Sequence, residues 1–205
     1  HNTAVGSQSQ LNATTGEFNT SLGSLSMGTG VTTGNSNVAI GYQSGLALTS
    51  GSENITIGQG AGDALTTGNR NVAVGHAALS TENEHGKNVA IGYLSLLTLD
   101  AGVDGFNVAV GYGAGALMTT GVENTLIGGQ AGDSLTTGTR NVALGYQALN
   151  SEDAHGNNVA IGFASLYAQD AGTDAYNTAV GYASGINVTT GAYNTLIGGL
   201  AGDAL

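Results

Sequence analysis

The residues best suited to bind a metal ion lie in two turns that carry paired carboxylates. Asp100 and Asp104 flank one turn, and Asp170 and Asp174 occupy the same places in a second copy of it. Hard carboxylate oxygens held close together are the ligands that Ca²⁺ prefers. The glycine-rich nonapeptide of calcium-binding β-rolls is absent from the chain, however. We therefore expect solvated turns and no metal site, with calcium at these four residues as the alternative.

Two histidines in polar turns are the other candidate metal ligands. His85 and His155 each precede a glycine, and acidic residues lie close to both in the sequence. Imidazole is a common metal ligand, and three symmetry-related copies of such a turn would suffice for a site if they met on an axis. Because the turns are polar, we expect them to face water, and we expect the chain to need no cofactor.

Motifs for catalysis are weak. The glycine-rich runs 58–62 and 111–115 expose backbone amides of the kind that bind oxyanions, but neither has dinucleotide spacing, a lysine or a following helical pattern. A loose match to a nucleophile elbow at 41–45 places its serine one position late. Paired carboxylates suit glycoside cleavage, yet no tryptophan is present to line a polysaccharide cleft. The prediction is that the protein is not an enzyme.

Composition excludes several classes of protein. The 205 residues include 36 glycines and no proline, cysteine or tryptophan. The glycines have no period of three, which excludes a collagen triple helix. Because 40% of the chain is hydrophobic, a disordered linker is excluded as well. An ordered, turn-rich protein without disulfides remains.

The charge balance excludes two classes of partner. Fourteen acidic residues stand against three lysines and arginines, for a formal net charge of −11. Such a chain repels phosphate backbones and anionic lipid surfaces, so we expect no nucleic-acid partner. No apolar run is long enough for a membrane-spanning helix, so we expect no membrane insertion of this segment.

One pentapeptide recurs from end to end, and it must organise the fold. It consists of Asn, a β-branched residue, a residue that is most often alanine, an aliphatic residue and Gly. Most of its asparagines are spaced by seventeen positions, one pair by eighteen and two pairs by nineteen. These asparagines, which we expect to form a structural hydrogen-bonded ladder, are Asn2, Asn19, Asn37, Asn54, Asn71, Asn88, Asn107, Asn124, Asn141, Asn158, Asn177 and Asn194.

Each repeat predicts a strand, a glycine bend, a second short strand and a turn that is often Thr-Thr-Gly. Large and small side chains alternate along the pentapeptide, which is the period of a β-strand. A unit of this length is too short for a βαβ motif, and no segment has helical spacing of apolar residues. Such a small unit also cannot bury its own apolar face. We therefore predict an all-β fold, a parallel β-solenoid of about twelve coils that hydrogen-bond to one another.

Apolar columns offer a surface for association between chains. We expect the aliphatic residues on one face of the strands and alanines on the other, where small side chains would allow neighbouring chains to approach closely. A further column, just after the glycine bend, is mostly aromatic. We expect its rings to pack between coils or chains rather than to form a sugar-binding stripe. Its members are Tyr42, His76, Tyr93, Tyr112, Tyr146, Phe163 and Tyr182.

A second, longer repeat is made of several of these units. Residues 37–106 and 107–176 align without gaps, and both end in one of the nineteen-residue units. A partial third copy covers 177–205. We call each copy a long repeat. We expect one repeat domain over 1–205, and we expect it to be a fragment of a longer fibrous protein, because the third copy stops part-way.

The repeats resemble those of a known family. The segments 37–44 and 158–165 are similar to the head repeats of YadA-like trimeric autotransporter adhesins. The segments 177–182, 189–191 and 194–198 are similar to repeats of bacteriophage and phage-like tail fibres. This resemblance implies a left-handed β-roll and a homotrimer.

The expected function follows from the repeat and the resemblance together. It is a structural and adhesive segment of an extracellular trimeric fibre, in a virion tail or on a bacterial cell surface. Its partners would be two further copies and a receptor or glycan on a host cell. The alternative is a ligand-binding solenoid, either an ice-binding protein that uses its threonine turns or a calcium-binding protein. A third hypothesis is a tailspike that cleaves polysaccharide.

Overall fold

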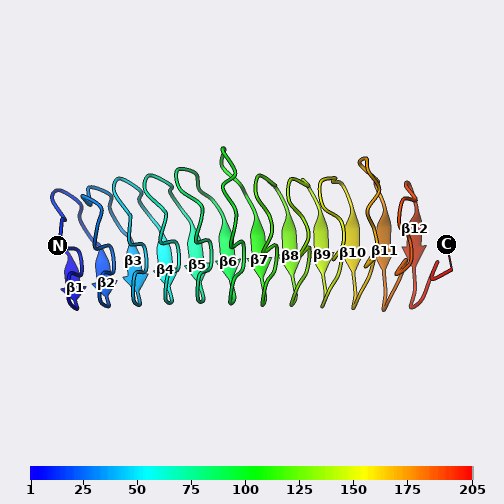
Figure 1. Cartoon of the computed structure of the whole chain (residues 1–205), viewed down its shortest axis with the longest axis horizontal. Coiled ribbons are helices and arrows are strands. Elements are labelled where there is room, and N and C mark those ends of the chain that lie inside the picture. Colours follow the sequence, from blue (N-terminus) through cyan, green and yellow to red (C-terminus); the bar gives the residue numbers. More distant parts are fainter. Residues whose placement is uncertain (205) are drawn as a thin grey trace.

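The computed structural model describes residues 1–204, which form one parallel β-solenoid (Figure 1). Twelve short strands lie side by side in chain order, and every neighbouring pair is parallel. The predicted all-β parallel solenoid is thus confirmed, with about eleven full turns between the first and last strands. The strands are β1 (Thr3–Val5), β2 (Thr20–Leu22), β3 (Val38–Ile40), β4 (Ile55–Ile57), β5 (Val72–Val74), β6 (Val89–Ile91), β7 (Val108–Val110), β8 (Thr125–Ile127), β9 (Val142–Leu144), β10 (Val159–Ile161), β11 (Thr178–Val180) and β12 (Thr195–Ile197).

Helices are absent from residues 1–204. A membrane-spanning helix is accordingly not found in this part of the chain.

The strands correspond to the middle three residues of the pentapeptide, and the register follows the repeat. Val89, Ala90 and Ile91 of β6, for example, pair with Val108, Ala109 and Val110 of β7. Side chains alternate across the strand, because the middle residue is buried while its two neighbours are half-buried or exposed. The period-two pattern therefore identified the strands correctly.

The second short strand predicted for each unit is wrong. In the β3 unit the apolar residues of this predicted strand are Leu46, Ala47 and Leu48, and they lie in or at the end of a run of turns. Gln43 and Gly45 both adopt positive φ, at 57° and 56°. The Leu48 N–H closes this turn on the Gly45 carbonyl at 3.1 Å. A left-handed residue at every second position folds the backbone back on itself, so extended structure cannot form there.

The expected roles of the two strand faces must also be corrected. Ala73, Ala90 and Ala109 of the strands are fully buried in the core of the solenoid, not on a surface that meets other chains. The aliphatic column points outward instead, with Ile91 38% and Leu144 41% exposed. The physical reason is space. So short a coil encloses room for few side chains, so the strand contributes its smallest residue to the interior.

Several coils fill the core with one large and one small residue. In the β6 coil the strand supplies Ala90, and Leu96 fills the space opposite. In the β8 coil the strand supplies Leu126, and Gly132 occupies the position that Leu96 has in the β6 coil. A Cβ added at Gly132 would lie 2.9 Å from a Leu126 methyl carbon. A further core column, eleven positions after each asparagine, holds Leu65, Leu99 and Leu135 among others.

The glycine after each strand has two roles: it adopts a positive φ, and it lets the backbone of the next coil approach closely. Gly111 has φ of +141°, a value that L side chains rarely adopt. A Cβ added there would lie 2.6 Å from the Gly128 carbonyl carbon in the next coil. Backbones of successive coils therefore touch at this column, with no space for a side chain between them.

The two longest coils differ from the rest in one projecting turn. Their extra residues fall at 100–105 and 170–175, and the corresponding loops stand out beyond the others near β6 and β11 in Figure 1. The insertions lengthen the spacing between successive asparagines, but the strands on either side of each insertion remain paired.

Candidate functional site

The asparagine column forms a continuous hydrogen-bonded ladder inside the solenoid. In the central coils, the Asn124 Oδ1 accepts the backbone N–H of Asn141 at 2.9 Å, and Asn107 does the same for Asn124 at 3.0 Å. The Asn124 Nδ2 donates to the carbonyl of Gly138 at 2.8 Å. Asparagines 19 to 177 of the column are buried. These side chains connect coils and cannot contact a ligand.

The outward face of the sheet is a continuous apolar stripe. It is made by the first and third residues of all twelve strands, which are threonine, valine, isoleucine or leucine at every position. All of these residues are half-buried or exposed, and Ile55 and Ile91 are 38% exposed. We call this surface the outer stripe. Monomeric soluble proteins rarely expose a contiguous apolar surface of this extent, so it is the leading candidate for an interaction site.

Stacked rings border the outer stripe. His76, Tyr93 and Tyr112 form one stack, with ring centroids 5.1 and 5.4 Å apart. Tyr146 and Phe163 lie 5.7 Å apart in a second, equivalent stack that Tyr182 completes at 5.3 Å. The rings thus pack between coils, as expected, while about half of each Tyr and Phe side chain remains exposed. Their exposed edges extend the apolar surface beside the strands.

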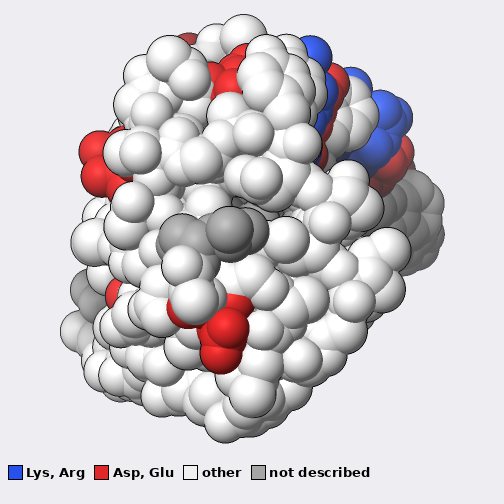
Figure 2. All heavy atoms as spheres, turned by 90° about the vertical axis from the view of Figure 1, so that its right-hand side faces the viewer, with Lys and Arg blue, Asp and Glu red and all other residues white. Residues whose placement is uncertain are grey.

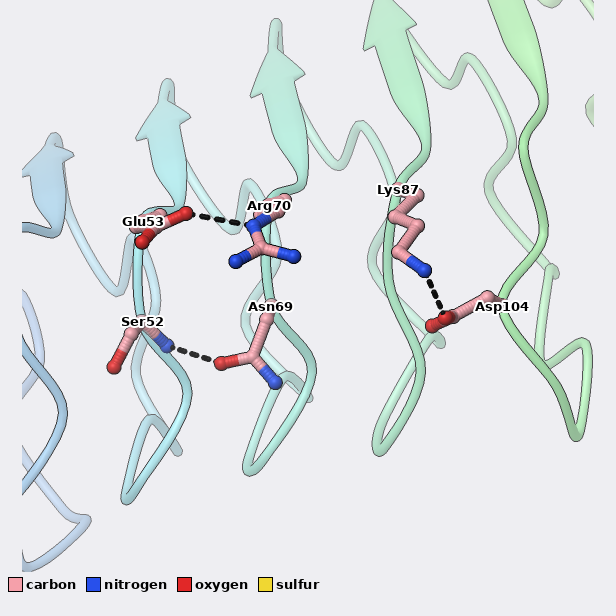
Figure 3. Close-up of a pocket in the computed structure, with 6 residues that line it drawn as sticks. All are labelled: Ser52, Glu53, Asn69, Arg70, Lys87 and Asp104. Carbon is pink, nitrogen blue, oxygen red and sulfur yellow. Dashed lines mark hydrogen bonds and ion pairs between the residues drawn. The ribbon is translucent and has the colours of Figure 1, made fainter.

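A shallow polar pocket of 360 Å³ lies on the surface of the β4 to β7 coils (Figure 3). Arg70 donates to Glu53 at 2.7 Å, and Lys87 contacts Asp104 at 2.6 Å. Ser52 and Asn69 complete the lining. Each cation is neutralised by a carboxylate beside it, so the pocket presents no free charge to an ionic ligand.

Positive charge gathers on one part of the surface. In the end-on view of Figure 2, lysine and arginine lie at one edge of the molecule, next to acidic side chains. The third cation, Arg140, lies 3.9 Å from Glu123, which repeats the Arg70 to Glu53 pair in the next long repeat. All three positive side chains therefore face acidic partners.

Two clusters of acidic and histidine side chains occupy equivalent places in the two complete long repeats. The first contains Glu82, His85 and Asp100, and their ligand atoms lie within 4.8 Å of one another. The second cluster consists of Glu152, Asp153, His155 and Asp170. Asp153 is the additional carboxylate, and the four ligand atoms again lie within 4.8 Å of one another. In each cluster one coil supplies the glutamate and the histidine, and the following coil supplies the aspartate of the projecting turn.

The glutamates of these clusters are buried, which the sequence analysis missed. Glu82 and Glu152 have no exposed surface. Burial raises the pKa of each carboxyl, while backbone N–H groups of neighbouring residues oppose the shift. Both residues lie eleven positions after an asparagine, in the column that Leu65 and Leu99 occupy in neighbouring coils. An acidic residue in a leucine column was the available signal.

The paired carboxylates of the projecting turns are separated in the structure. Asp100 lies in the first cluster, whereas Asp104 pairs with Lys87 and accepts the Gly86 N–H at 3.2 Å. The hydrogen bond that Lys87 donates to Asp104 lowers the pKa of this carboxyl, and the positive charge of Lys87 adds to the effect. In the second copy, Asp174 accepts the N–H of Gly156 at 2.9 Å. The two aspartates of one turn therefore have different neighbours.

Threonine hydroxyls of the turns are used within the solenoid. Thr49 donates to the Thr66 carbonyl at 2.9 Å, and Thr136 donates to the Asp153 carbonyl at 2.8 Å. Hydroxyls engaged in this way join successive coils.

Asp133 gives a prediction for the dependence of stability on pH. This half-buried carboxyl has a raised pKa because of burial. A raised folded-state pKa stabilises the fold below the ordinary carboxyl range, and that contribution is lost as pH rises through the folded pKa. Asp133→Asn is therefore expected to raise the urea midpoint at pH 7 and not at pH 3. The gain should stay below about 1 kcal/mol, because solvent screens a partly exposed group.

Asp63 is the matched control for this prediction. It occupies the equivalent position in the preceding long repeat, but it accepts a hydrogen bond from the Ser80 Oγ at 2.7 Å. Asp63→Asn weakens that bond and should give no gain at pH 7. Equal gains in the two variants would show that burial of Asp133 is not the cause.

Comparisons with known proteins returned nothing. No protein-family model, no curated protein and no solved structure matches the chain. Its function must therefore be argued from its surfaces.

Proposed function

We propose that the chain is a structural and adhesive segment of an extracellular homotrimeric fibre, in which the outer stripe is the contact between chains. The stripe runs along all twelve strands and carries an aliphatic residue at each of them. Burial of such a surface against two further copies would remove apolar area from water along the full length of the solenoid. This stripe is the observation that carries the proposal.

The shape and charge of the chain suit a fibre. Twelve strands in one continuous stack make a rod about 55 Å long at the usual strand spacing. Three chains would carry a formal charge of 3 × (−11) = −33, which keeps such rods apart in solution. Three copies of any receptor-binding surface would act together and increase avidity.

The resemblance of the repeats supplies the finer features of the proposal. The repeat at 158–165 is similar to YadA-like adhesin heads, and that at 177–182 to phage-like tail fibres. We therefore propose a left-handed roll, a location in a virion tail or on a bacterial surface, and a receptor or glycan of a host cell as the final partner.

The mass in solution tests the proposal. Light scattering on a size-exclusion column should give about three times the 20.1 kDa of one chain. Ile57→Lys combined with Ile127→Lys places two charges in the outer stripe at equivalent strands and should reduce the mass to that of one chain. A desolvated, unpaired lysine at an interface costs several kcal/mol.

Ser50→Lys combined with Thr120→Lys is the matched control. It adds the same charge at exposed turn positions, again equivalent in the two long repeats, outside the outer stripe. This variant should remain trimeric. A monomeric wild-type chain, or a trimer that tolerates lysine in the stripe, contradicts the proposal.

A further inference from the structure

The buried glutamates occupy a place in the core that most of the other coils fill with apolar side chains, Gln169 being the other buried polar residue of this column. Leu65, Leu99 and Leu135 are fully buried in this column, and Glu82 and Glu152 are buried to the same degree. A carboxylate loses several kcal/mol of hydration when it is buried without a charge partner. The column repeats this cost in both complete long repeats, and a cation beside each carboxylate would offset it.

Backbone N–H groups reach both oxygens of Glu82 but only one oxygen of Glu152. The Glu82 oxygens accept the N–H groups of His85 at 3.2 Å and Ala101 at 3.3 Å. The Glu152 Oε1 accepts the His155 N–H at 3.1 Å, but its buried Oε2 has no hydrogen-bond partner among the described residues. In the first cluster, the buried Nδ1 atom of His85 is likewise without a partner in residues 1–204. Each cluster thus directs an unpaired donor or acceptor atom toward its neighbours.

Protein cations do not supply the missing charge. Arg70, Lys87 and Arg140 are the only lysines and arginines of the sequence, and each lies against a different carboxylate. The remaining candidates are the histidines themselves and an ion from solution. In the first cluster, His85 Nδ1 lies 3.8 Å from Glu82 Oε1, beyond hydrogen-bond distance. In the second cluster, His155 Nδ1 contacts Glu152 Oε1 at 3.3 Å, which leaves Glu152 Oε2 without a partner among the described residues.

The geometry suits an ion held between the side chains. His155 Nδ1 lies 3.3 Å from Glu152 Oε1, and all four ligand atoms of the second cluster lie within 4.8 Å of one another. Donor atoms bound to one tetrahedral Zn²⁺ lie roughly 3.3 to 3.6 Å apart, given bonds of about 2.0 to 2.2 Å. Movement of exposed side chains by up to about 1 Å would bring each cluster to that size. Imidazole nitrogen beside carboxylate oxygen favours zinc over calcium.

We propose that each complete long repeat binds one Zn²⁺ ion, through Glu82, His85 and Asp100 in the first copy and through Glu152, Asp153, His155 and Asp170 in the second. The ion would join consecutive coils, because the glutamate and histidine belong to one coil and the aspartate to the next. It would also fix the base of the projecting turn, which begins at the aspartate.

The two sites differ at one position, which predicts a difference in affinity. Asp153 adds a carboxylate to the second cluster, whereas Asn83 stands at the equivalent place in the first and binds the Thr66 hydroxyl. An additional anionic ligand strengthens the binding of a divalent cation. We therefore expect the second site to bind Zn²⁺ more tightly, by about tenfold or more.

Calorimetric titration of the metal-free full chain with Zn²⁺ tests this proposal. All proteins would carry His1→Ser, so that the first residue cannot bind the ion. Two Zn²⁺ ions per chain are expected, with a rise in the thermal midpoint. Co²⁺ should bind at the same sites and report imidazole ligation by its visible spectrum. Asp153→Asn should weaken the second site to the level of the first.

Histidine variants distinguish the sites from general surface binding. His85→Ala combined with His155→Ala changes side chains that are 30% and 27% exposed, so folding, checked by circular dichroism, should survive. This variant should lose at least about tenfold in affinity at both sites. His76→Tyr removes a histidine outside the clusters, in the ring stack, and should bind Zn²⁺ as before. Two-ion binding that survives in the double variant, or a wild-type chain that binds Ca²⁺ as tightly as Zn²⁺, overturns the proposal.

Discussion

Gly111→Ala is expected to destabilise the solenoid strongly, although it adds only one methyl group. The new Cβ would lie 2.6 Å from the Gly128 carbonyl carbon, and real Cβ atoms do not approach backbone atoms closer than about 3.0 Å. The φ of +141° is also strained for alanine. Since backbone atoms on both sides must move, we expect a loss of about 3 to 5 kcal/mol. The urea midpoint measures it.

Gly102→Ala separates backbone strain from the overlap between coils. Gly102 has φ of +69° in the projecting turn, and no atom of the described residues lies within 4 Å of a Cβ added there. Alanine in this left-handed conformation costs about 1 to 2 kcal/mol. Equal losses in Gly102→Ala and Gly111→Ala would mean that the contact between coils at Gly111 adds nothing. In that case the glycine would be retained for its φ alone.

The sequence predicts the parallel solenoid because its regular period fixes both the strand and its partner. In-register stacking places residue 90 against residue 109, and the pairing of β6 with β7 follows directly. The longest units do not disturb this register, since their extra residues enter the projecting turn. Period alone therefore determined the topology.

The same reasoning failed where ordinary propensities mislead. Leu94 and Leu96 adopt φ of 57° and 47°, a region that branched side chains rarely enter. An apolar run of this kind is typical of a strand, so a second strand was predicted where consecutive left-handed turns occur. Only the stacking of coils, which holds these turns by hydrogen bonds such as Leu96 N–H to the Ala114 carbonyl at 3.0 Å, makes the conformation favourable.

The candidate zinc clusters were only half visible in the sequence. His85 and Asp100 were both considered as ligands, but separately, because they lie far apart along the chain. Coil stacking brings residues one unit apart into contact, and the clusters form across that step. Glu82 escaped notice because it was not compared with Leu65 and Leu99 in its own column. The polarity of each core column had to be traced along the chain, because an acidic residue among leucines was the signal.

Asn124→Ala is expected to cause the second large loss of stability, because it breaks the ladder in its middle. The substitution leaves the buried N–H of Asn141 and the carbonyl of Gly138 without their partners. Each unsatisfied buried group costs about 1 to 3 kcal/mol, so a total of about 2 to 6 kcal/mol is expected for the two groups. The midpoint of urea unfolding, followed by circular dichroism, measures the change.

Asn69→Ala is the matched control, since it removes the same kind of bond at the surface. The Asn69 Oδ1 accepts the Ser52 N–H of the preceding coil at 2.8 Å, but both groups are near solvent (Figure 3). Water replaces the lost acceptor there, so the cost should stay within about 0.5 to 1 kcal/mol. If Asn124→Ala costs no more than Asn69→Ala, burial of the ladder does not contribute to stability. The asparagine would then be retained for the backbone geometry where the strand begins.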